Sequence, residues 1–276
     1  MIKLRRVIAY ITLISLVLLC LFPFFVLLIN ASRSHPEVLR GFSAIPGNFL
    51  VRNFRNVLAN PNMTVVRSTL NSLLIAGGTV LLATYISALT AFGIHAYEFK
   101  FKKIAFVFIL LVMMIPQQVS ALGFVRMIEA WDMRNSFLPL ILPASASPVV
   151  FFFMIQYMKS TLSTEIVEAA RIDGSHEFMT FNRIVLPLIK PALAVQAIFI
   201  FVGTWNSFFI PALLLDDSSM FTLPILIARL RGADFVTLDL GQVNMLIGLS
   251  LLPVVIVYLA LSKFIVRGIA LGGVKE

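Results

Sequence analysis

Long apolar stretches constrain this chain more than any other feature of its sequence. Only 13% of its 276 residues are charged, against about 25% in a typical soluble domain. Six stretches are each long enough to cross a bilayer, which requires roughly 20 apolar residues in a helix. Because helices satisfy their own backbone hydrogen bonds in lipid, we expect an all-α integral membrane protein with six transmembrane helices. The predicted spans are residues 7–30, 70–97, 104–125, 135–158, 184–215, whose uncharged part begins at Pro191, and 240–262.

The basic residues indicate how these spans are oriented. Lys100, Lys102 and Lys103 cluster in the short connection between the second and third spans, and short basic loops stay in the cytoplasm. This predicts that the N- and C-termini lie in the cytoplasm. The outer loop 31–69 is also rich in arginine, but long loops count less in this rule. The net charge of +9 therefore reflects topology and attraction to anionic lipid rather than nucleic acid.

Between the spans, the chain has room for loops but not for a second domain. We expect one transmembrane domain over residues 1–276, with short helices and turns in the outer loop 31–69. The second outer loop, 216–239, contains an apolar stretch, Phe221–Ala228, that is too short to cross a membrane. That stretch must lie on the membrane, enter a cavity or touch an external partner. A lone cysteine, Cys20, excludes a disulfide framework.

A short polar segment, residues 159–183, separates the fourth and fifth spans. Ser163 is suited to cap a helix whose first turn carries Glu165, and Gly174 suits a left-handed helix stop. Ser175 is suited to cap the helix that follows. Composition alone favours an amphipathic helix lying on the inner leaflet without a protein partner.

A resemblance changes that interpretation. Glu168-Ala169-Ala170, then Gly174, then Ile184, Leu186 and Pro187 resemble the signature of importer permeases of the ATP-binding-cassette (ABC) family at every signature position. Gly203–Phe208 and the tail Gly268–Lys275 resemble the carbohydrate-uptake branch, specifically the smaller permease of maltose-type transporters. The similarity extends over nearly the whole chain, including its topology.

The resemblance implies a non-catalytic subunit in the inner membrane of a bacterial or archaeal cell, where it forms half of the pathway for a sugar or oligosaccharide. Its partners would be a second, different permease, two ATPase subunits that bind ATP and Mg²⁺, and an external sugar-binding protein. This chain contains no phosphate-binding glycine-rich loop, so we expect no cofactor in it. The implied coupling helix would dock on an ATPase, and the loop at 216–239 would contact the binding protein. The coupling residues are Glu168, Ala169, Ala170, Asp173, Gly174, Ser175, Gly272 and Gly273, and the loop residues are Phe221, Arg229, Arg231 and Asp234.

Polar and aromatic residues within the spans are candidates for the pathway. Sugars stack on aromatic rings and hydrogen-bond to fixed polar groups, which singles out Gln117, Gln118, Tyr157, Trp205, Asn206 and Phe208. Contacts between helices explain the glutamines and Asn206 slightly better than substrate contacts do. His35, His95 and His176 are too scattered to suggest a metal site.

Two alternatives remain at this point. A stand-alone secondary transporter usually shows internal repeats and ionisable groups at mid-membrane, and the spans contain no acidic residue. A glycerol-phosphate importer of the same family would share every motif described above. The sequence leaves the cargo open, because specificity can reside in the binding protein.

Overall fold

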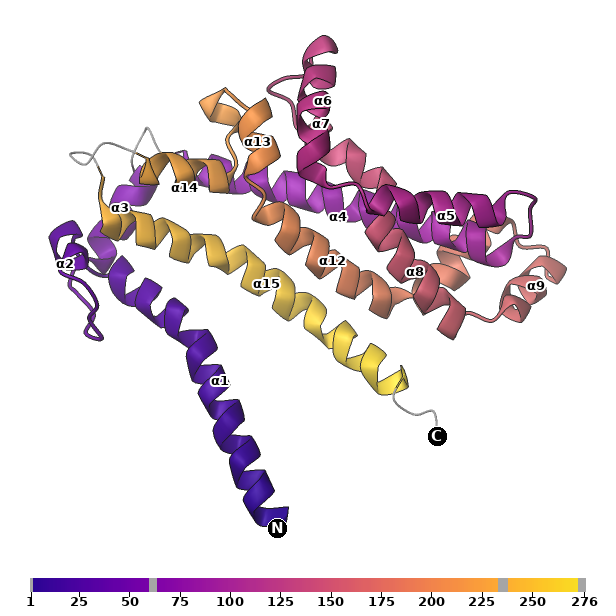
Figure 1. Cartoon of the computed structure of the whole chain (residues 1–276), viewed down its shortest axis with the longest axis horizontal. Coiled ribbons are helices and arrows are strands. Elements are labelled where there is room, and N and C mark those ends of the chain that lie inside the picture. Colours follow the sequence, from indigo (N-terminus) through magenta and orange to yellow (C-terminus); the bar gives the residue numbers. More distant parts are fainter. Residues whose placement is uncertain (1, 60–63, 233–237, 273–276) are drawn as a thin grey trace. The chain divides into compact units, whose positions relative to one another are not determined.

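The computed structural model describes residues 2–59, 64–232 and 238–272. Every regular element within these ranges is helical, and no strand occurs there, which confirms the predicted all-α fold class (Figure 1). The chain divides into two compact units. One unit comprises residues 1–69 and 225–252, and the other comprises residues 70–224 and 253–276. Because the boundaries fall inside helices, a single transmembrane domain over 1–276 stays a prediction.

Four helical segments are long and apolar enough to cross a membrane: Arg5–Ala31, Val65–Ala96, Leu138–Thr161 and Leu240–Phe264. They coincide with the first, second, fourth and sixth predicted spans. The third and fifth predicted spans coincide with helix pairs that are sharply bent, Lys102–Met113 with Gln118–Ala130 and Glu177–Leu188 with Lys190–Trp205. Six spans therefore result only if each bent pair crosses as one unit, and the six-span topology stays a prediction.

The first unit contains a long N-terminal helix followed by short ones. The loop 31–69 forms short helices and turns, as predicted. The elements are α1 (Ile2–Ala31), α2 (His35–Leu39), α3 (Leu50–Ala59), the start of α4 (Val65–Ala96), most of α14 (Leu223–Arg231) and the first part of α15 (Leu240–Gly272).

Backbone groups and one buried amide connect α1, α3 and α15. Asn53 is 2% exposed, and its Nδ2 donates to the carbonyl oxygens of Ala31 and Arg33, both at 2.9 Å. Asp239 caps α15 by accepting from the Gly241 N–H at 2.9 Å. A Cβ at Gly241 would collide with the Arg33 carbonyl oxygen and Asn53 Nδ2. Glycine at position 241 therefore allows α15 to begin directly against this junction.

The second unit packs the remaining helices around one apolar core. Its further elements are α5 (Lys102–Met113), α6 (Gln117–Ala130), α7 (Leu138–Ile141), η1 (Leu142–Ala146), α8 (Pro148–Thr161), α9 (Thr164–Ile172), α10 (Glu177–Thr180), the π-helical turn η2 (Phe181–Val185), α11 (Leu186–Leu188), α12 (Lys190–Trp205), α13 (Phe209–Leu214) and η3 (Ser218–Met220). The core joins α4, α8, α9 and η2, and its fully buried members include Met154, Ile155, Val167 and Phe181. Phe181 contacts the rings of Tyr85 and Phe92, each at 5.6 Å between centroids.

Proline explains where the fifth predicted span breaks. A proline lacks an N–H and crowds the carbonyl four residues before it. Pro187 lies two residues beyond the end of the π-helical turn η2, which is closed by a bond from the Leu186 N–H to Phe181 O. The wider turn accommodates the proline ring, and such turns are frequent at functional sites. Residues 177–188 then meet residues 190–205 at an angle of 79°.

Candidate functional site

The predicted helix within residues 159–183 is present as α9, and its start is the one expected. Ser163 has an extended backbone, and its hydroxyl oxygen accepts from the Glu165 N–H at 3.2 Å. Such a cap satisfies one of the first N–H groups of a helix, which lack partners within the helix itself. The Glu165 carboxylate lies in the first turn, where the positive end of the helix dipole favours it. The capped start of α9 is therefore confirmed.

The end of α9 is set by Gly174, which has a φ of +76°. The Gly174 N–H bonds to Arg171 O at 3.0 Å, and the Ser175 N–H bonds to Ala170 O at 2.9 Å. This pair of bonds is the Schellman motif, which satisfies the last carbonyls of a helix through a left-handed residue. An added Cβ would meet no heavy atom within 4 Å. The backbone angle, rather than a lack of space, therefore favours glycine here.

One detail of the prediction is wrong. Ser175 does not cap the helix that follows, because the residue at the cap of α10 is His176, without a side-chain cap bond. The Ser175 oxygen instead accepts from the Thr180 hydroxyl at 2.9 Å. The Schellman turn extends one residue beyond Gly174 and uses the Ser175 backbone. The cap position of α10 therefore falls on His176, and the helix begins at Glu177.

The faces of α9 differ sharply in exposure. Val167 and Ala170 are buried in the core of the second unit. The predicted coupling residues Glu168, Ala169, Asp173 and Gly174 are exposed, and Ser175 is half-buried. Ile172 is 87% exposed despite its apolar side chain. The helix thus presents an uncovered surface that carries the carboxylates of Glu168 and Asp173 and the side chain of Ile172.

Polar contacts hold α9 to its surroundings at each end. Arg171 Nε donates to Glu177 Oε1 at 2.7 Å, and the guanidinium lies 5.1 Å from the centre of the Tyr97 ring, which directly follows α4. At the other end, His95 Nε2 is 2.9 Å from the carbonyl oxygen of Leu162. His95 is therefore hydrogen-bonded to the segment that precedes α9. Both links join the α9 region to the end of α4.

The charge on Glu177 follows from this arrangement. The Arg171 hydrogen bond holds the pKa of the Glu177 carboxyl below its ordinary value, and the nearby Tyr97 hydroxyl adds to the effect. Glu177 Oε2 is buried and makes no hydrogen bond of standard geometry within the described part of the chain. Tyr97 therefore acts on the carboxylate by proximity. The lowered pKa means that the ion pair persists well below neutral pH.

The predicted pathway residues do not form one described cluster. Trp205 is 2% exposed and stacks on Phe201 at 5.6 Å and 15°, which places it in the packing of its own helix. Asn206 is exposed, and its Nδ2 bonds back to Val202 O at 2.9 Å, within its own helical segment. Gln118 and Phe208 are exposed and Tyr157 is half-buried. The side chain of Gln117 lies outside the described residues.

The outer-loop residues differ in accessibility. Phe221 is only 3% exposed, so it is available to a partner only if the loop rearranges. Arg229 and Arg231, near the end of α14, are exposed. Asp234 and Gly273 lie outside the described residues, and Gly272 is the last residue of α15.

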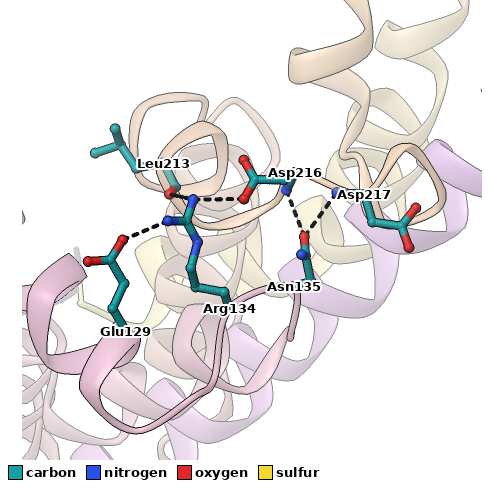
Figure 2. A network of polar contacts seen from close by, with 6 residues as sticks. All are labelled: Glu129, Arg134, Asn135, Leu213, Asp216 and Asp217. Carbon is teal, nitrogen blue, oxygen red and sulfur yellow. Dashed lines mark hydrogen bonds and ion pairs between the residues drawn. The ribbon is translucent and has the colours of Figure 1, made fainter.

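A contact network that sequence reasoning missed lies at the base of this loop. Figure 2 shows Arg134 between the carboxylates of Glu129 and Asp216, at 2.6 and 2.7 Å, with Asn135 beside it. No local signal pairs residues 129–135 with residue 216, because the partners are about 80 positions apart in the chain.

Within the described ranges, no group of three or more His, Cys, Asp or Glu residues could hold a metal ion.

Comparison with known proteins agrees with the signature in 168–187. The model of a family described as "Binding-protein-dependent transport system inner membrane component" matches residues 83–271. The chain is 34% identical to an arabinooligosaccharides transport system permease of Bacillus subtilis (strain 168), covering 94% of this chain and 92% of that protein. It is 30% identical to a trehalose/maltose transport system permease of Thermococcus litoralis (99% and 98%). It is also 31% identical to an sn-glycerol-3-phosphate transport system permease of Yersinia pestis (98% and 98%).

A solved structure shows the same fold. One chain of a bacterial ABC transporter involved in the import of the acidic polysaccharide alginate superposes with a TM-score of 0.82. The match covers 95% of this chain and 96% of that chain at 18% identity. At this identity the likeness supports the fold alone.

Proposed function

This chain belongs to the family of binding-protein-dependent transport system inner membrane components, and we propose that it is a permease subunit of an ABC importer for a sugar or oligosaccharide. It would form half of the pathway beside a second, different permease. The arabinooligosaccharide and trehalose/maltose relatives support a carbohydrate cargo. The glycerol-3-phosphate relative is similar at a comparable level, but the 34% match to the arabinooligosaccharide permease favours a sugar. Family membership also argues against a stand-alone secondary transporter.

The observation that carries the proposal is the exposed face of α9. A capped helix that is anchored by two buried residues, Val167 and Ala170, keeps its shape while a partner approaches its outer face. Glu168 and Ala169 lie on that outer face, where the small alanine allows close backbone approach. We propose that this face docks on one of two ATPase subunits, which bind ATP and Mg²⁺. Movement of the ATPase would then displace α9 and the segments fixed to it.

The remaining assignments follow from this docking. The side of the membrane that carries α9 must be the cytoplasm, which agrees with the lysine cluster at 100–103 and places both termini there. The loop 216–239 then faces outward, where a sugar-binding protein delivers its cargo. The tail that includes Gly272 and Gly273 would reach toward the ATPases. We propose the pathway role for Gln118, Tyr157 and Phe208, whose side chains are at least partly accessible.

The test is a charge reversal on α9 in the assembled transporter. The chain is co-expressed with a partner permease and ATPase subunits, and the complex is reconstituted in proteoliposomes for uptake and in nanodiscs for ATPase activity. We expect Glu168→Lys to insert and assemble normally but to abolish sugar uptake and the stimulation of ATPase activity by the binding protein. Glu98→Lys is the matched control, because Glu98 is an exposed carboxylate whose one ion pair among the described residues is with Lys102, at the start of α5. Unchanged uptake and stimulation in Glu168→Lys would refute the proposal.

A further inference from the structure

The turn between α6 and α7 is fastened to the segment that enters the outer loop. Asn135 Oδ1 accepts from the N–H groups of both Asp216 and Asp217, at 2.7 and 3.0 Å. The Asn135 N–H in turn bonds to Leu214 O at 3.0 Å. Figure 2 shows the amide oxygen directed at the two backbone nitrogens. Asn135 thus bonds to three backbone groups on the path from α13 into the loop, between Leu214 and Asp217.

Backbone conformation explains why asparagine stands at this position. Asn135 has a φ of +51°, in the left-handed region that most side chains avoid. Asparagine and aspartate tolerate this region better than other residues that carry a Cβ. Glycine would accept the angle but would lack the accepting oxygen. The turn therefore requires a short side chain with an acceptor and a tolerance for left-handed backbone, and both requirements are met by asparagine.

Arg134 adds a second, weaker connection between the same segments. Its guanidinium contacts Glu129 on α6 and Asp216 at the base of the loop, and the side chains of the three residues are 40%, 42% and 62% exposed. Exposed ion pairs contribute little, typically about 0.2–1 kcal/mol each. The two bonds to Asn135 do not depend on charge, so they carry most of the constraint.

The other end of the loop base is fixed on α4. Asn71 Nδ2 donates to the carbonyl oxygens of Ser219 and Phe221, both at 3.0 Å. The Leu223 N–H donates to Ser72 Oγ at 2.8 Å. Between these anchors, Asp217 accepts from the Ser219 N–H at 2.8 Å. Residues 216–223 are thus held at both ends by side chains from elsewhere in the second unit.

We infer that Asn135 is a positioning residue that holds residues 216–223, at the start of the loop, in a fixed orientation for contact with the binding protein. The inference rests on the proposed function, since it takes the binding protein as the partner of this loop. Fixing a loop before binding removes the entropic cost of ordering it in the complex. Loss of Asn135 would therefore weaken the apparent affinity for the binding protein without altering the hydrolysis machinery or the pathway.

The test measures two quantities in the assembled transporter in nanodiscs. The first is hydrogen exchange in a peptide that contains the Asp216 and Asp217 amides. The second is the concentration of the sugar-loaded binding protein that gives half-maximal ATPase stimulation. We expect Asn135→Ala to speed exchange and to raise that concentration about tenfold, equivalent to about 1.4 kcal/mol. The maximal stimulated rate and the amount of assembled complex should stay as in the wild type.

Three further variants separate positioning from general damage. Asn135→Gly keeps the backbone angle and should still show the defect, whereas Asn135→Asp restores the acceptor and should recover most of the affinity. Asp132→Gly is the matched control, because Asp132 has a φ of +53° in the same turn, and no described contact involves its side chain. Faster exchange in Asn135→Ala with an unchanged half-maximal concentration would overturn the inference and leave the proposed function intact. A wild-type transporter that the binding protein does not stimulate would instead overturn the proposed function.

Discussion

Helix α9, for which we propose docking on an ATPase, and the turn at Trp131–Asn135, called the outer turn below, are both polar features of the second unit, but they are built in opposite ways. In α9 the backbone closes on itself through Gly174 and Ser175, and the outward side chains are left uncovered. In the outer turn, side chains reach across to hold the backbone of a distant segment at Asp216 and Asp217. The first arrangement suits a surface on which a partner docks, and the second suits a loop that must be held in one orientation.

The largest effect is expected where the backbone of α9 alone is altered. Gly174→Val places a β-branched residue at a φ of +76°, where even an unbranched L-residue costs roughly 1–2 kcal/mol. We expect the end of α9 to unwind and sugar uptake to fall to background, while the chain still inserts. The measurements are uptake into proteoliposomes and stimulated ATPase activity in nanodiscs.

Gly174→Asn is the control for that experiment. Asparagine tolerates left-handed backbone, and a Cβ at this position meets no neighbouring heavy atom. It should therefore retain most of the uptake. Equal loss in both variants would show that the stop of α9 depends on something other than backbone angle.

A smaller effect is expected where α9 relies on side chains. Arg171→Ala removes the hydrogen bond to Glu177 and the contact with the Tyr97 ring. Because the Schellman turn remains, we expect α9 to persist but to transmit movement to α4 less tightly. ATP hydrolysed per sugar imported should rise several-fold, with stimulated hydrolysis largely retained. Arg171→Lys keeps the charge but not the planar group and should fall between. An unchanged ratio in Arg171→Ala would show that this contact is not part of the coupling.

The same contrast explains what the sequence could predict. Ser163 and Gly174 act on neighbours within a few positions, so the start and stop of α9 follow from local rules. The prediction that Ser175 caps the next helix is wrong because a Schellman turn uses the backbone of the residue after the glycine. Asn135 and Asp216 are 81 positions apart, and nothing local pairs them. The indole ring of Trp205 suggests a residue of the sugar pathway. In the structure this ring stacks on Phe201, one helical turn away, and is therefore part of the packing of α12.

A still smaller effect is expected from the charged part of the outer turn. Arg134→Gln removes both exposed ion pairs, each worth about 0.2–1 kcal/mol, and leaves the Asn135 bonds in place. We expect the half-maximal binding-protein concentration to rise about twofold to threefold, well short of the Asn135→Ala effect. The wild-type value should also approach that of the variant at high salt, because exposed charges are screened. A defect as large as that of Asn135→Ala would show that charge, rather than the amide, aims the loop.

The smallest effect concerns the pH dependence of the Arg171–Glu177 pair, which holds the end of α9. Because the Arg171 hydrogen bond lowers the pKa of the Glu177 carboxyl from 4.5, this pair stabilises the folded arrangement above that pH and is lost as the pH falls through the lowered value. A nitroxide at Ile172→Cys, in a Cys20→Ser background that removes the lone natural thiol, reports the mobility of α9. We expect mobility to rise only below about pH 4.5, by a small amount, since both side chains are more than a third exposed. In Glu177→Gln this dependence should disappear, because the variant has no proton to gain at position 177. Mobility that rises identically in Glu177→Gln would assign the acid effect to the other carboxylates of α9, and the link between α9 and α4 would then rest on the Tyr97 and His95 contacts alone.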